Sequence, residues 1–392
     1  MDYTRRQFGK LALAGLPAAA LLETPLFGSA LRQAKPNSKF GGVQIGVITY
    51  SYRSMSDQSG QATLKYILDS GLSGCELMDG PAENFAGAPA APARTGGPGG
   101  AGGGRARGGA AAAGAAAAAA ATPPPPLEPG QPSWKGQPCA NGRGAGGAGG
   151  RRGGARAELT PEQQAAAAAA QAHQADLKKW RTSVSMDRFK ALRKMYNDAG
   201  VTIYAYKSDG MQKNLQTSDE ELDYLFNVAS TLGATHTTME LPAPGPDGTA
   251  MLKRMAQFAE KHKVYVAYHT HGQGSMTVFD EALAMSPWNK SNVDLGHYVA
   301  AGNHGGSPIE FLERHHDRIA SFHLKDRTLP EHCSLTVPFG EGDGQIKDIL
   351  LTMQKNKWTF PATIELESMI PQGSDAVQEV RKSVEFCRAV LT

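Results

Sequence analysis

Short apolar runs alternate along the chain with segments whose apolar side chains recur three and four residues apart. Such runs predict buried strands, and the three-and-four spacing between them predicts amphipathic helices. Eight strands alternating with helices indicate one α/β domain, a single (β/α)8 TIM barrel. The predicted strands are residues 43–48, 74–78, 201–206, 234–239, 264–268 and 362–364, with two more inside residues 293–327.

The alternation stops between the second and third predicted strands. Residues 87–157 are almost entirely Gly, Ala, Pro and Arg. Such a segment cannot bury enough apolar surface to offset the entropy of ordering it, so we expect a disordered insertion within the barrel. Its arginines could contact a polyanionic surface, but a solvated, inert tether is the simpler interpretation.

Helical character returns at Thr160. This residue can cap a helix, Pro161 fits the first turn, and Gln163 occupies the capping-box position. The apolar stripe that follows continues to Gly200, with a break predicted near Ser183. The interruption therefore ends at a well-defined helix start.

Composition places limits on the class of protein. The chain has 392 residues and a formal net charge of +3. Without the leader and the insertion, roughly 290 residues remain, enough for one eight-stranded barrel. The cysteines lie far apart in the sequence, a spacing that implies neither a disulfide framework nor a zinc ribbon: Cys75, Cys139, Cys333 and Cys387.

The first 30 residues have the features of an export signal. Arg5 and Arg6 are followed by Phe8 and Lys10, and then by an Ala/Leu run that is too short to span a bilayer. This stretch resembles a bacterial twin-arginine signal peptide, with small residues near Ser29 for cleavage. A plain basic, amphipathic N-terminus is the alternative. We expect a twin-arginine translocation partner, a periplasmic or extracytoplasmic location and no stable membrane span.

Acidic, imidazole and amine side chains follow the predicted strands at one end. In a TIM barrel the carboxyl ends of all strands meet at one face, where ligands bind. A mixed carboxylate and imidazole set suits one divalent ion (Mn, Co, Mg or Zn), and further carboxylates can transfer protons. The strand-end residues are Tyr50, Lys207, Glu240, His269, His271, Asp294, His297, His323, Lys325, Glu365 and Glu367.

Each of these positions also has a purely structural explanation. A single His or Asp after a strand is often a helix cap, and Glu240 or Glu367 could be a solvated loop acid. One of His269 and His271 could be structural. Lys325 and Asp326 could form a surface ion pair. The coincidence at successive strand ends is harder to explain in this way than any one position.

The motifs at these strand ends resemble the sugar phosphate isomerase/epimerase superfamily, the xylose isomerase-like TIM barrels. The matching pieces are His-Thr-His-Gly at 269–272, Asp-Leu-Gly-His at 294–297, His-Leu-Lys-Asp at 323–326, Gly-Glu-Gly-Asp at 340–343 and Ile-Glu-Leu-Glu at 364–367. The resemblance implies that one metal ion is held by His269, Asp294, His323 and Glu365, with Glu240 as a further candidate ligand.

The resemblance also implies roles for the other residues. His297 and Lys325 would contact the substrate and stabilise an oxyanion, and Tyr50, Lys207 and His271 would bind the substrate. The proton would be moved by Glu240, Glu365 or Glu367. Ketose epimerases of this superfamily usually carry Glu where this chain has His269, which puts a two-glutamate epimerisation in doubt.

We therefore expect a metal-dependent sugar isomerase or epimerase that acts on an unphosphorylated sugar or keto-sugar through an enediolate. A dehydratase or lyase acting on keto-sugars or 3-keto-glycosides is the main alternative, and a non-catalytic sugar-binding barrel is another. Nucleic acid is not an expected partner, since an endonuclease-like member would need more His ligands and a basic rim. Barrels of this superfamily are often homo-oligomers.

Overall fold

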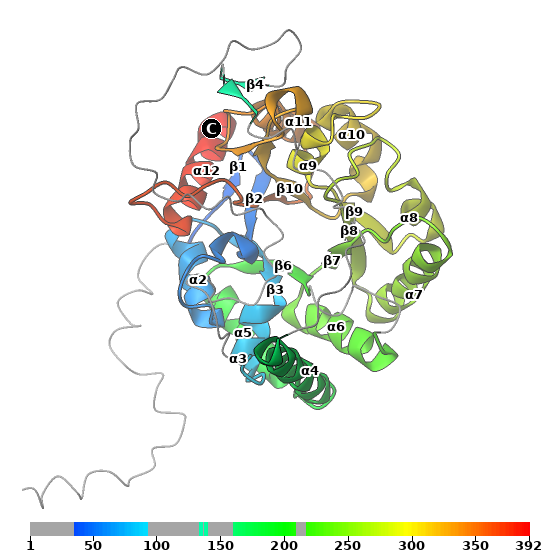
Figure 1. Cartoon of the computed structure of the whole chain (residues 1–392). Coiled ribbons are helices and arrows are strands. Elements are labelled where there is room, and N and C mark those ends of the chain that lie inside the picture. Colours follow the sequence, from blue (N-terminus) through cyan, green and yellow to red (C-terminus); the bar gives the residue numbers. More distant parts are fainter. Residues whose placement is uncertain (1–34, 93–132, 136, 140–159, 209–216) are drawn as a thin grey trace, which may run out of the picture. The chain divides into compact units, whose positions relative to one another are not determined.

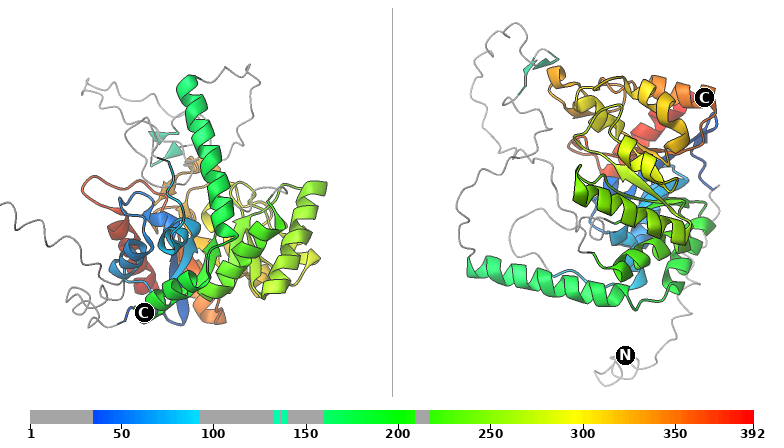
Figure 2. Two further views of the ribbon diagram at one scale, coloured as in Figure 1. Left: turned by 90° about the horizontal axis from the view of Figure 1, so that it is seen from below. Right: turned by 90° about the vertical axis from the view of Figure 1, so that its right-hand side faces the viewer.

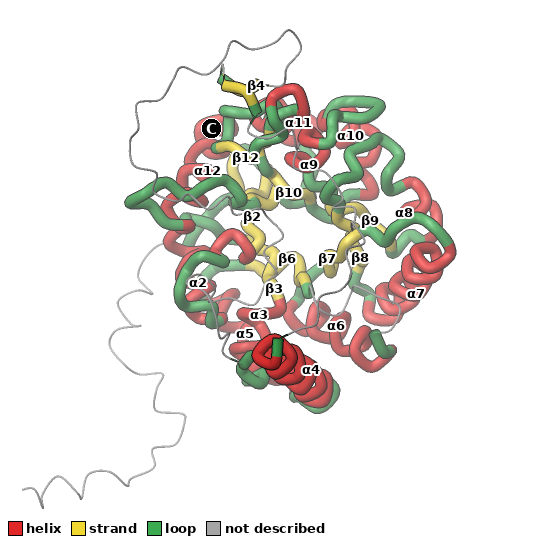
Figure 3. The backbone as a smooth tube through the Cα atoms, viewed as in Figure 1, coloured by secondary structure: helices red, strands yellow, loops and turns green. Residues whose placement is uncertain are grey.

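The computed structural model describes residues 35–92, 133–135, 137–139, 160–208 and 217–392. Eight parallel strands lie side by side around a central axis, in the order β10-β13-β2-β3-β6-β7-β8-β9 (Figures 1 and 3). In chain order they are β2 (Val43–Ile48), β3 (Gly74–Met78), β6 (Thr202–Lys207), β7 (His236–Glu240), β8 (Tyr265–His269), β9 (Asn289–Asn292), β10 (Phe322–Leu324) and β13 (Ala362–Ile364). The predicted α/β TIM barrel is confirmed.

The barrel closes between β9 and β10. Two isolated parallel bridges join them, Ser291 with Ile319 and Asp294 with His323. The amides of Ala320 and His323 donate across this junction to the carbonyls of Ser291 and Val293, at 3.0 and 2.9 Å. A short strand, β1 (Lys39–Phe40), pairs antiparallel with β2.

Helices surround the strands on the outside (Figure 1). Their buried faces carry the apolar side chains that the three-and-four spacing predicted, such as Leu222, Leu225 and Val228 on α6. The α-helices are α2 (Gly60–Asp69), α3 (Asp79–Ala86), α4 (Pro161–Arg181), α5 (Asp187–Asp198), α6 (Asp219–Leu232), α7 (Pro246–His262), α8 (Asp280–Met285), α9 (Leu295–Ala300), α10 (Pro308–His315), α11 (Ile346–Asn356) and α12 (Ala376–Leu391).

Strand β9 is the one that the apolar pattern misplaced. The pattern put the sixth strand at Val293, whereas β9 is the polar run Asn289–Asn292. Its two asparagines are buried and hydrogen-bonded: Asn289 Nδ2 donates to Ala282 O, and Asn292 Nδ2 donates to Ser321 Oγ, both at 2.8 Å. A strand whose polar groups are satisfied inside the barrel leaves no apolar run in the sequence.

Polar side chains also fill the barrel interior. His236 Nε2 contacts Ser321 Oγ at 2.9 Å, and Ser321 accepts from Asn292, which in turn contacts His269. Lower in the interior, the Tyr204 hydroxyl lies 2.9 Å from Thr363 Oγ1. Gly46 leaves room for that phenol, since a Cβ there would lie 2.2 Å from the Tyr204 hydroxyl. The contacts from His236 through Ser321 and Asn292 therefore connect the start of β7 with His269 at the end of β8.

The described part of the insertion contacts the barrel through a short hairpin. Residues 133–134 and 137–138 form the short antiparallel hairpin of β4 (Ser133–Trp134) and β5 (Gln137–Pro138). A disulfide joins Cys139 to Cys333, in the loop after β10, with Cα atoms 5.3 Å apart. Lys135 Nζ also pairs with Glu341 at 2.8 Å. The cysteine spacing gave no sign of this single bond, because partners 194 residues apart leave no local cysteine pattern.

Most of the predicted disordered insertion, residues 93–132, 136 and 140–159, lies outside the described residues, as does the predicted signal peptide at 1–30. The chain is described again at α4, whose capping box of Thr160 and Gln163 is present as predicted. The last turn of α4 is buried at Leu177 and Arg181, and the helix extends past the ends of the barrel helices (Figure 2).

None of the helices in the described part of the chain is both long and apolar enough to cross a membrane.

Candidate active site

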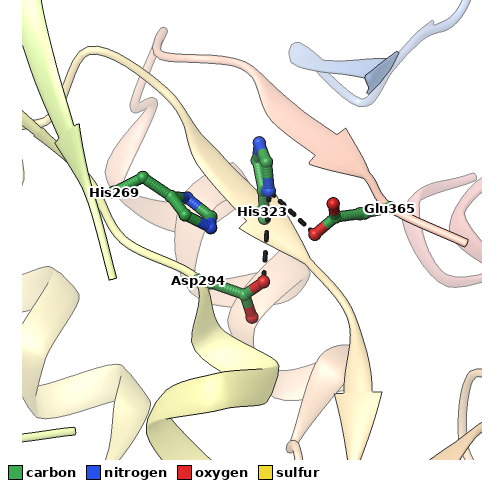
Figure 4. Close-up of side chains that lie close together, drawn as sticks. All are labelled: His269, Asp294, His323 and Glu365. Carbon is green, nitrogen blue, oxygen red and sulfur yellow. Dashed lines mark hydrogen bonds and ion pairs between the residues drawn. The ribbon is translucent and has the colours of Figure 1, made fainter. Parts of the chain in front are cut away.

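Four buried side chains from neighbouring strand ends converge on one point (Figure 4). His269 ends β8, Asp294 and His323 face each other where the barrel closes, and Glu365 follows β13. One ligand-type atom from each lies within 4.8 Å of all the others. The four residues that the family resemblance assigned to a metal therefore form one cluster.

His269 presents a lone pair to this cluster. Its Nδ1 lies 2.9 Å from Asn292 Oδ1 and 3.2 Å from Asn292 O, both of which are acceptors, so Nδ1 carries the ring proton. The unprotonated Nε2 is buried and has no hydrogen-bond partner. Burial and then Lys207 lower the pKa of His269 to about 3, which keeps the ring neutral. A buried nitrogen acceptor without a donor is the state that a metal ligand requires.

His323 is held from both sides of its ring. Nδ1 lies 3.0 Å from Glu365 Oε2, and Nε2 lies 3.1 Å from Glu76 Oε2. Burial opposes protonation, but Glu365 and Glu76 outweigh it and raise the pKa of His323 to about 10. Glu76 also accepts from Thr238 at 2.5 Å. A carboxylate behind the second nitrogen is the arrangement that orients metal-binding histidines.

Lys325 places an ammonium group beside the same carboxylates. Its Nζ lies 2.8 Å from Asp294 Oδ2, 2.7 Å from Glu365 Oε2 and 2.8 Å from Glu367 Oε2. Burial would lower the pKa of Lys325, but Asp294 and Glu365 raise it above its usual value. Burial would likewise raise the pKa values of Asp294 and Glu365, yet Lys325 keeps both low. The cluster is therefore ionised and partly neutralised.

A second group lies beside the first. Glu240, at the end of β7, accepts from His271 Nδ1 at 2.7 Å, and its other oxygen is 3.6 Å from Lys207 Nζ. Burial would lower the pKa of His271, but its hydrogen bond to Glu240 raises it. Glu240, His269 and His271 also have ligand atoms within 4.8 Å of one another. Glu240 thus adjoins the four-residue cluster without belonging to it.

His297 connects the two groups. Its ring centroid lies 4.8 Å from that of His271, and its Nε2 lies 3.3 Å from Lys325 Nζ. Nε2 is also 3.9 Å from Glu367 Oε2. Burial, followed by Lys325, keeps the pKa of His297 well below its usual value. A neutral imidazole, an ammonium group and a carboxylate therefore stand together in the site.

The rings of His269 and His271 lie 4.8 Å apart, both in the site. The surface ion pair considered for Lys325 and Asp326 is wrong. Lys325 and Asp326 do not pair: Lys325 enters the site, while Asp326 accepts from the amides of Gly340, Gly342 and Gly344 at 2.8–3.1 Å. Gly342 leaves room for this carboxylate, since a Cβ there would lie 2.4 Å from Asp326 Oδ1.

Tyr50 is less directly connected to the cluster. It lies in the single turn Thr49–Tyr52 at the exit of β2, and the Arg53 guanidinium covers its ring at 4.4 Å. Arg53 Nη1 donates to Leu366 O at 2.7 Å, between Glu365 and Glu367. Tyr50 is therefore placed beside the loop that carries the two glutamates.

Sequence reasoning missed several residues that hold the site. Glu76 lies in the middle of β3, two residues before the strand end, so the strand-end criterion that selected the other acids passed over it; a lone acid inside an apolar run is the signal that could have found it. Asn292 was missed because it lies in β9, the strand that the apolar pattern placed at Val293. Arg327, whose Nη1 lies 2.7 Å from His297 Nδ1, follows the His-Leu-Lys-Asp motif without any signal of its own.

Comparison with known proteins gives the family. The model of the xylose isomerase-like TIM barrel family matches residues 163–390, more than half of the chain. The chain belongs to this family. No curated protein matches it by sequence.

Solved structures share the fold at low identity. The probable 3-DHS dehydratase AsbF of Bacillus anthracis is 13% identical with a TM-score of 0.51, over 88% of this chain and 98% of that one. A sugar phosphate isomerase/epimerase from Parabacteroides distasonis is 13% identical with a TM-score of 0.49, over 92% and 97%. An L-ribulose 3-epimerase is 11% identical with a TM-score of 0.49, over 89% and 94%. The likeness to AsbF, the one of these three with a TM-score above 0.5, supports the common fold and nothing further.

The side chains present fit a divalent ion. The ligand set is two imidazoles and two carboxylates, and among the described residues no hydrogen-bond donor faces the lone pair of His269 Nε2. His323 can offer Nδ1 once its proton is displaced, since Glu76 accepts from Nε2. These four residues could therefore hold one metal ion.

Proposed function

We propose that this protein is a metal-dependent sugar isomerase or epimerase that acts on an unphosphorylated sugar or keto-sugar through an enediolate. The observation that carries the proposal is the unpartnered, buried Nε2 of His269, facing Asp294, His323 and Glu365. When bound there, a divalent ion such as Mn, Co, Mg or Zn would stabilise negative charge on adjacent substrate oxygens.

The chain's own residues supply the proton transfers. With Glu365 engaged as a ligand, Glu367 and Glu240 remain as bases within the site. The side chain of Glu367 is 28% exposed and that of Glu240 is 38% exposed, so both can reach a substrate. Lys325 and His297 lie beside Glu367, where the charge of the ammonium group and the imidazole N–H can stabilise an oxygen that becomes negative. Lys207, His271 and Tyr50 would orient the sugar.

The charge of the site favours an uncharged sugar. Lys325 is surrounded by carboxylates, and Lys207 lies beside Glu240. A phosphate group would have to approach Asp294, Glu365, Glu367 and Glu240 together, which like-charge repulsion opposes. Neutral hydroxyl groups can instead accept from the lysines and donate to the carboxylates.

Proton NMR in D₂O tests the proposal. Metal-loaded protein is incubated with free sugars and 3-keto-glucosides, and exchange of a carbon-bound proton together with a new ketose or epimer is expected. The Glu367→Gln and Glu240→Gln variants show which carboxylate moves the proton, and chelator-treated protein is the control. Loss of exchange only after metal removal supports the proposal. Full exchange without metal, or tight sugar binding without any exchange, contradicts it.

One observation favours a second candidate, a dehydratase or lyase acting on keto-sugars or 3-keto-glycosides. The fifth-strand ligand is the imidazole of His269 rather than a carboxylate base, and the imidazole of His297 lies 3.3 Å from the Lys325 ammonium group. Such a pair suits protonation of a leaving oxygen. In the same NMR experiment an enone or a released aglycone identifies this reaction.

We also propose that the protein is exported by the twin-arginine pathway. The Cys139–Cys333 disulfide supports this proposal, because structural disulfides persist in oxidising compartments. Cell fractionation of the wild type and of the Arg5→Lys, Arg6→Lys double variant tests it. Periplasmic wild-type protein and retained variant are expected, whereas a cytoplasmic wild type contradicts export.

A further inference from the structure

The imidazole of His297 contacts a cation at each nitrogen. Arg327 Nη1 lies 2.7 Å from Nδ1, and Lys325 Nζ lies 3.3 Å from Nε2. Arginine and lysine can only donate, and a neutral imidazole has one acceptor nitrogen. The two contacts therefore cannot both be hydrogen bonds to lone pairs, and one nitrogen must carry the proton.

Distances and donor counts decide which nitrogen that is. The contact with Arg327 is short, and a guanidinium stays protonated at any pH the protein meets. The three protons of Lys325 are matched by three carboxylate oxygens, all within 2.8 Å of Nζ. Lys325 thus has no proton left for His297, and its longer contact is a close approach between two donors.

We infer that Arg327 is a positioning residue that holds His297 as the neutral tautomer with its proton on Nε2. Nδ1 then accepts from Arg327, and the Nε2–H faces the carboxylates of Asp294 and Glu367 in the site. The carboxylate oxygens of Asp294 and Glu367 that face Nε2 are 3.8 and 3.9 Å away, beyond hydrogen-bond distance. The proton is therefore available to a substrate oxygen.

The surroundings hold Arg327 in place. Its side chain is buried, and Nη2 donates to Ser334 O at 2.6 Å. Ser334 is fixed in turn, since its Oγ donates to Ala300 O, at the end of the helix that carries His297, and its neighbour Cys333 is bonded to Cys139. The guanidinium is thus anchored to the disulfide-linked loop at one end and to His297 at the other.

This inference rests on the proposed function, because it gives His297 the role of proton donor to the sugar. The role needs the tautomer: with the proton on Nδ1, the substrate would meet a lone pair rather than a donor. Arg327 itself would not touch the substrate.

Nitrogen-15 NMR of the histidine side chains tests the tautomer directly. Full-length mature protein with ¹⁵N-labelled histidine is examined with and without Zn²⁺, which is diamagnetic, and the His297→Gln variant assigns the signals. We expect Nδ1 of His297 to have the shift of an unprotonated nitrogen and Nε2 that of a protonated one. A protonated Nδ1 in the wild type overturns the inference, and this result does not depend on any activity.

Variants test the role of Arg327. Arg327→Met should give a mixture of tautomers and lower kcat by roughly 100-fold, the usual scale for a lost proton donor, with little change in KM. Arg327→Lys keeps a hydrogen-bond donor and should partly restore both the single tautomer and kcat. Arg181→Met, which removes a buried arginine paired with Glu83 at 2.8 Å, is the matched control and should change stability alone. An unchanged tautomer in a folded Arg327→Met variant contradicts the inference.

Discussion

At the scale of single residues, the site depends on side chains that fix the ring nitrogens of its histidines. Asn292 leaves Nε2 of His269 free, and Glu76 faces Nε2 of His323, so that each ring directs its other nitrogen to the cluster. Carboxylates and amides in this position set both the tautomer and the basicity of a ligand. Metal affinity should therefore respond to residues that touch no metal.

Glu76→Gln should weaken divalent-metal binding by about 10- to 100-fold, because the amide no longer supports a histidine ligand with a negative charge. Isothermal titration with Zn²⁺ or Mn²⁺ measures the change. Glu83→Gln is a suitable control, since Glu83 is also buried but pairs with Arg181 and should affect stability instead. Equal affinities in the wild type and Glu76→Gln would show that Glu76 has no part in holding the ligand.

The buried, neutral ring of His236 should lower the free energy of unfolding at acid pH. Burial lowers its pKa to about 4, against a usual 6.5, so the unfolded chain takes up a proton that the folded protein excludes. The free energy of unfolding is therefore unaffected by this ring above pH 6.5. It decreases by roughly 3 kcal/mol as the pH falls from 6.5 toward 4. Denaturant unfolding between pH 7 and 4 should show a smaller decrease for His236→Gln. Parallel pH profiles for the two proteins would exclude His236 as the cause.

At the scale of elements, the insertion hairpin is a covalent part of the site's surroundings. Trp134 packs on His332 with ring centroids 5.6 Å apart, and Lys135 pairs with Glu341. Together with the disulfide, these contacts attach β4 and β5 to the loop that follows β10, so the insertion is not merely an inert tether. Its contribution to stability can be measured through the disulfide.

Reduction of Cys139–Cys333 should destabilise the protein by about 2–4 kcal/mol, because the bond constrains the unfolded chain over a long loop. Thermal unfolding with and without a reductant measures the effect. The Cys139→Ser, Cys333→Ser double variant should unfold at the lower temperature in both conditions, since the remaining cysteines, Cys75 and Cys387, are buried and unpaired. A wild type that is indifferent to reductant would mean that the bond contributes little to stability.

At the scale of the whole barrel, the metal cluster lies on the closing junction. Asp294 and His323 belong to the two sides of the junction between β9 and β10, where the backbone pairing consists of two isolated bridges. An ion bound by both residues would join the two sides. The cluster is thus placed where a ligand can complete the barrel.

Metal should therefore slow hydrogen exchange most at the amides of Ala320 and His323, which donate across the junction. At a metal concentration 100 times Kd the maximum effect is about 100-fold, equivalent to about 2.7 kcal/mol. The Tyr265 amide, which donates to Thr235 between β7 and β8, is the internal control. Equal slowing at all three amides indicates global stabilisation and no particular role for the junction.

The sequence by itself determined the order of elements and the end of the barrel that carries the chemistry. The strands β2, β3 and β13 have the predicted bounds, because an apolar run must be buried wherever it lies. The capping box at Thr160 is equally local. The polar residues at the strand ends were found for the same reason, since parallel strands in a barrel bring all their carboxyl ends to one face.

Only the tertiary structure decided which side chains meet across the barrel. Glu76 and His323 are 247 residues apart, Lys325 contacts carboxylates from two strands, and Cys139 reaches Cys333 across the insertion. The apolar pattern also misplaced β9, because Asn292 in this strand is satisfied by Ser321, 29 residues later in the sequence. Such pairings depend on the register of the closed barrel, which local periodicity does not record.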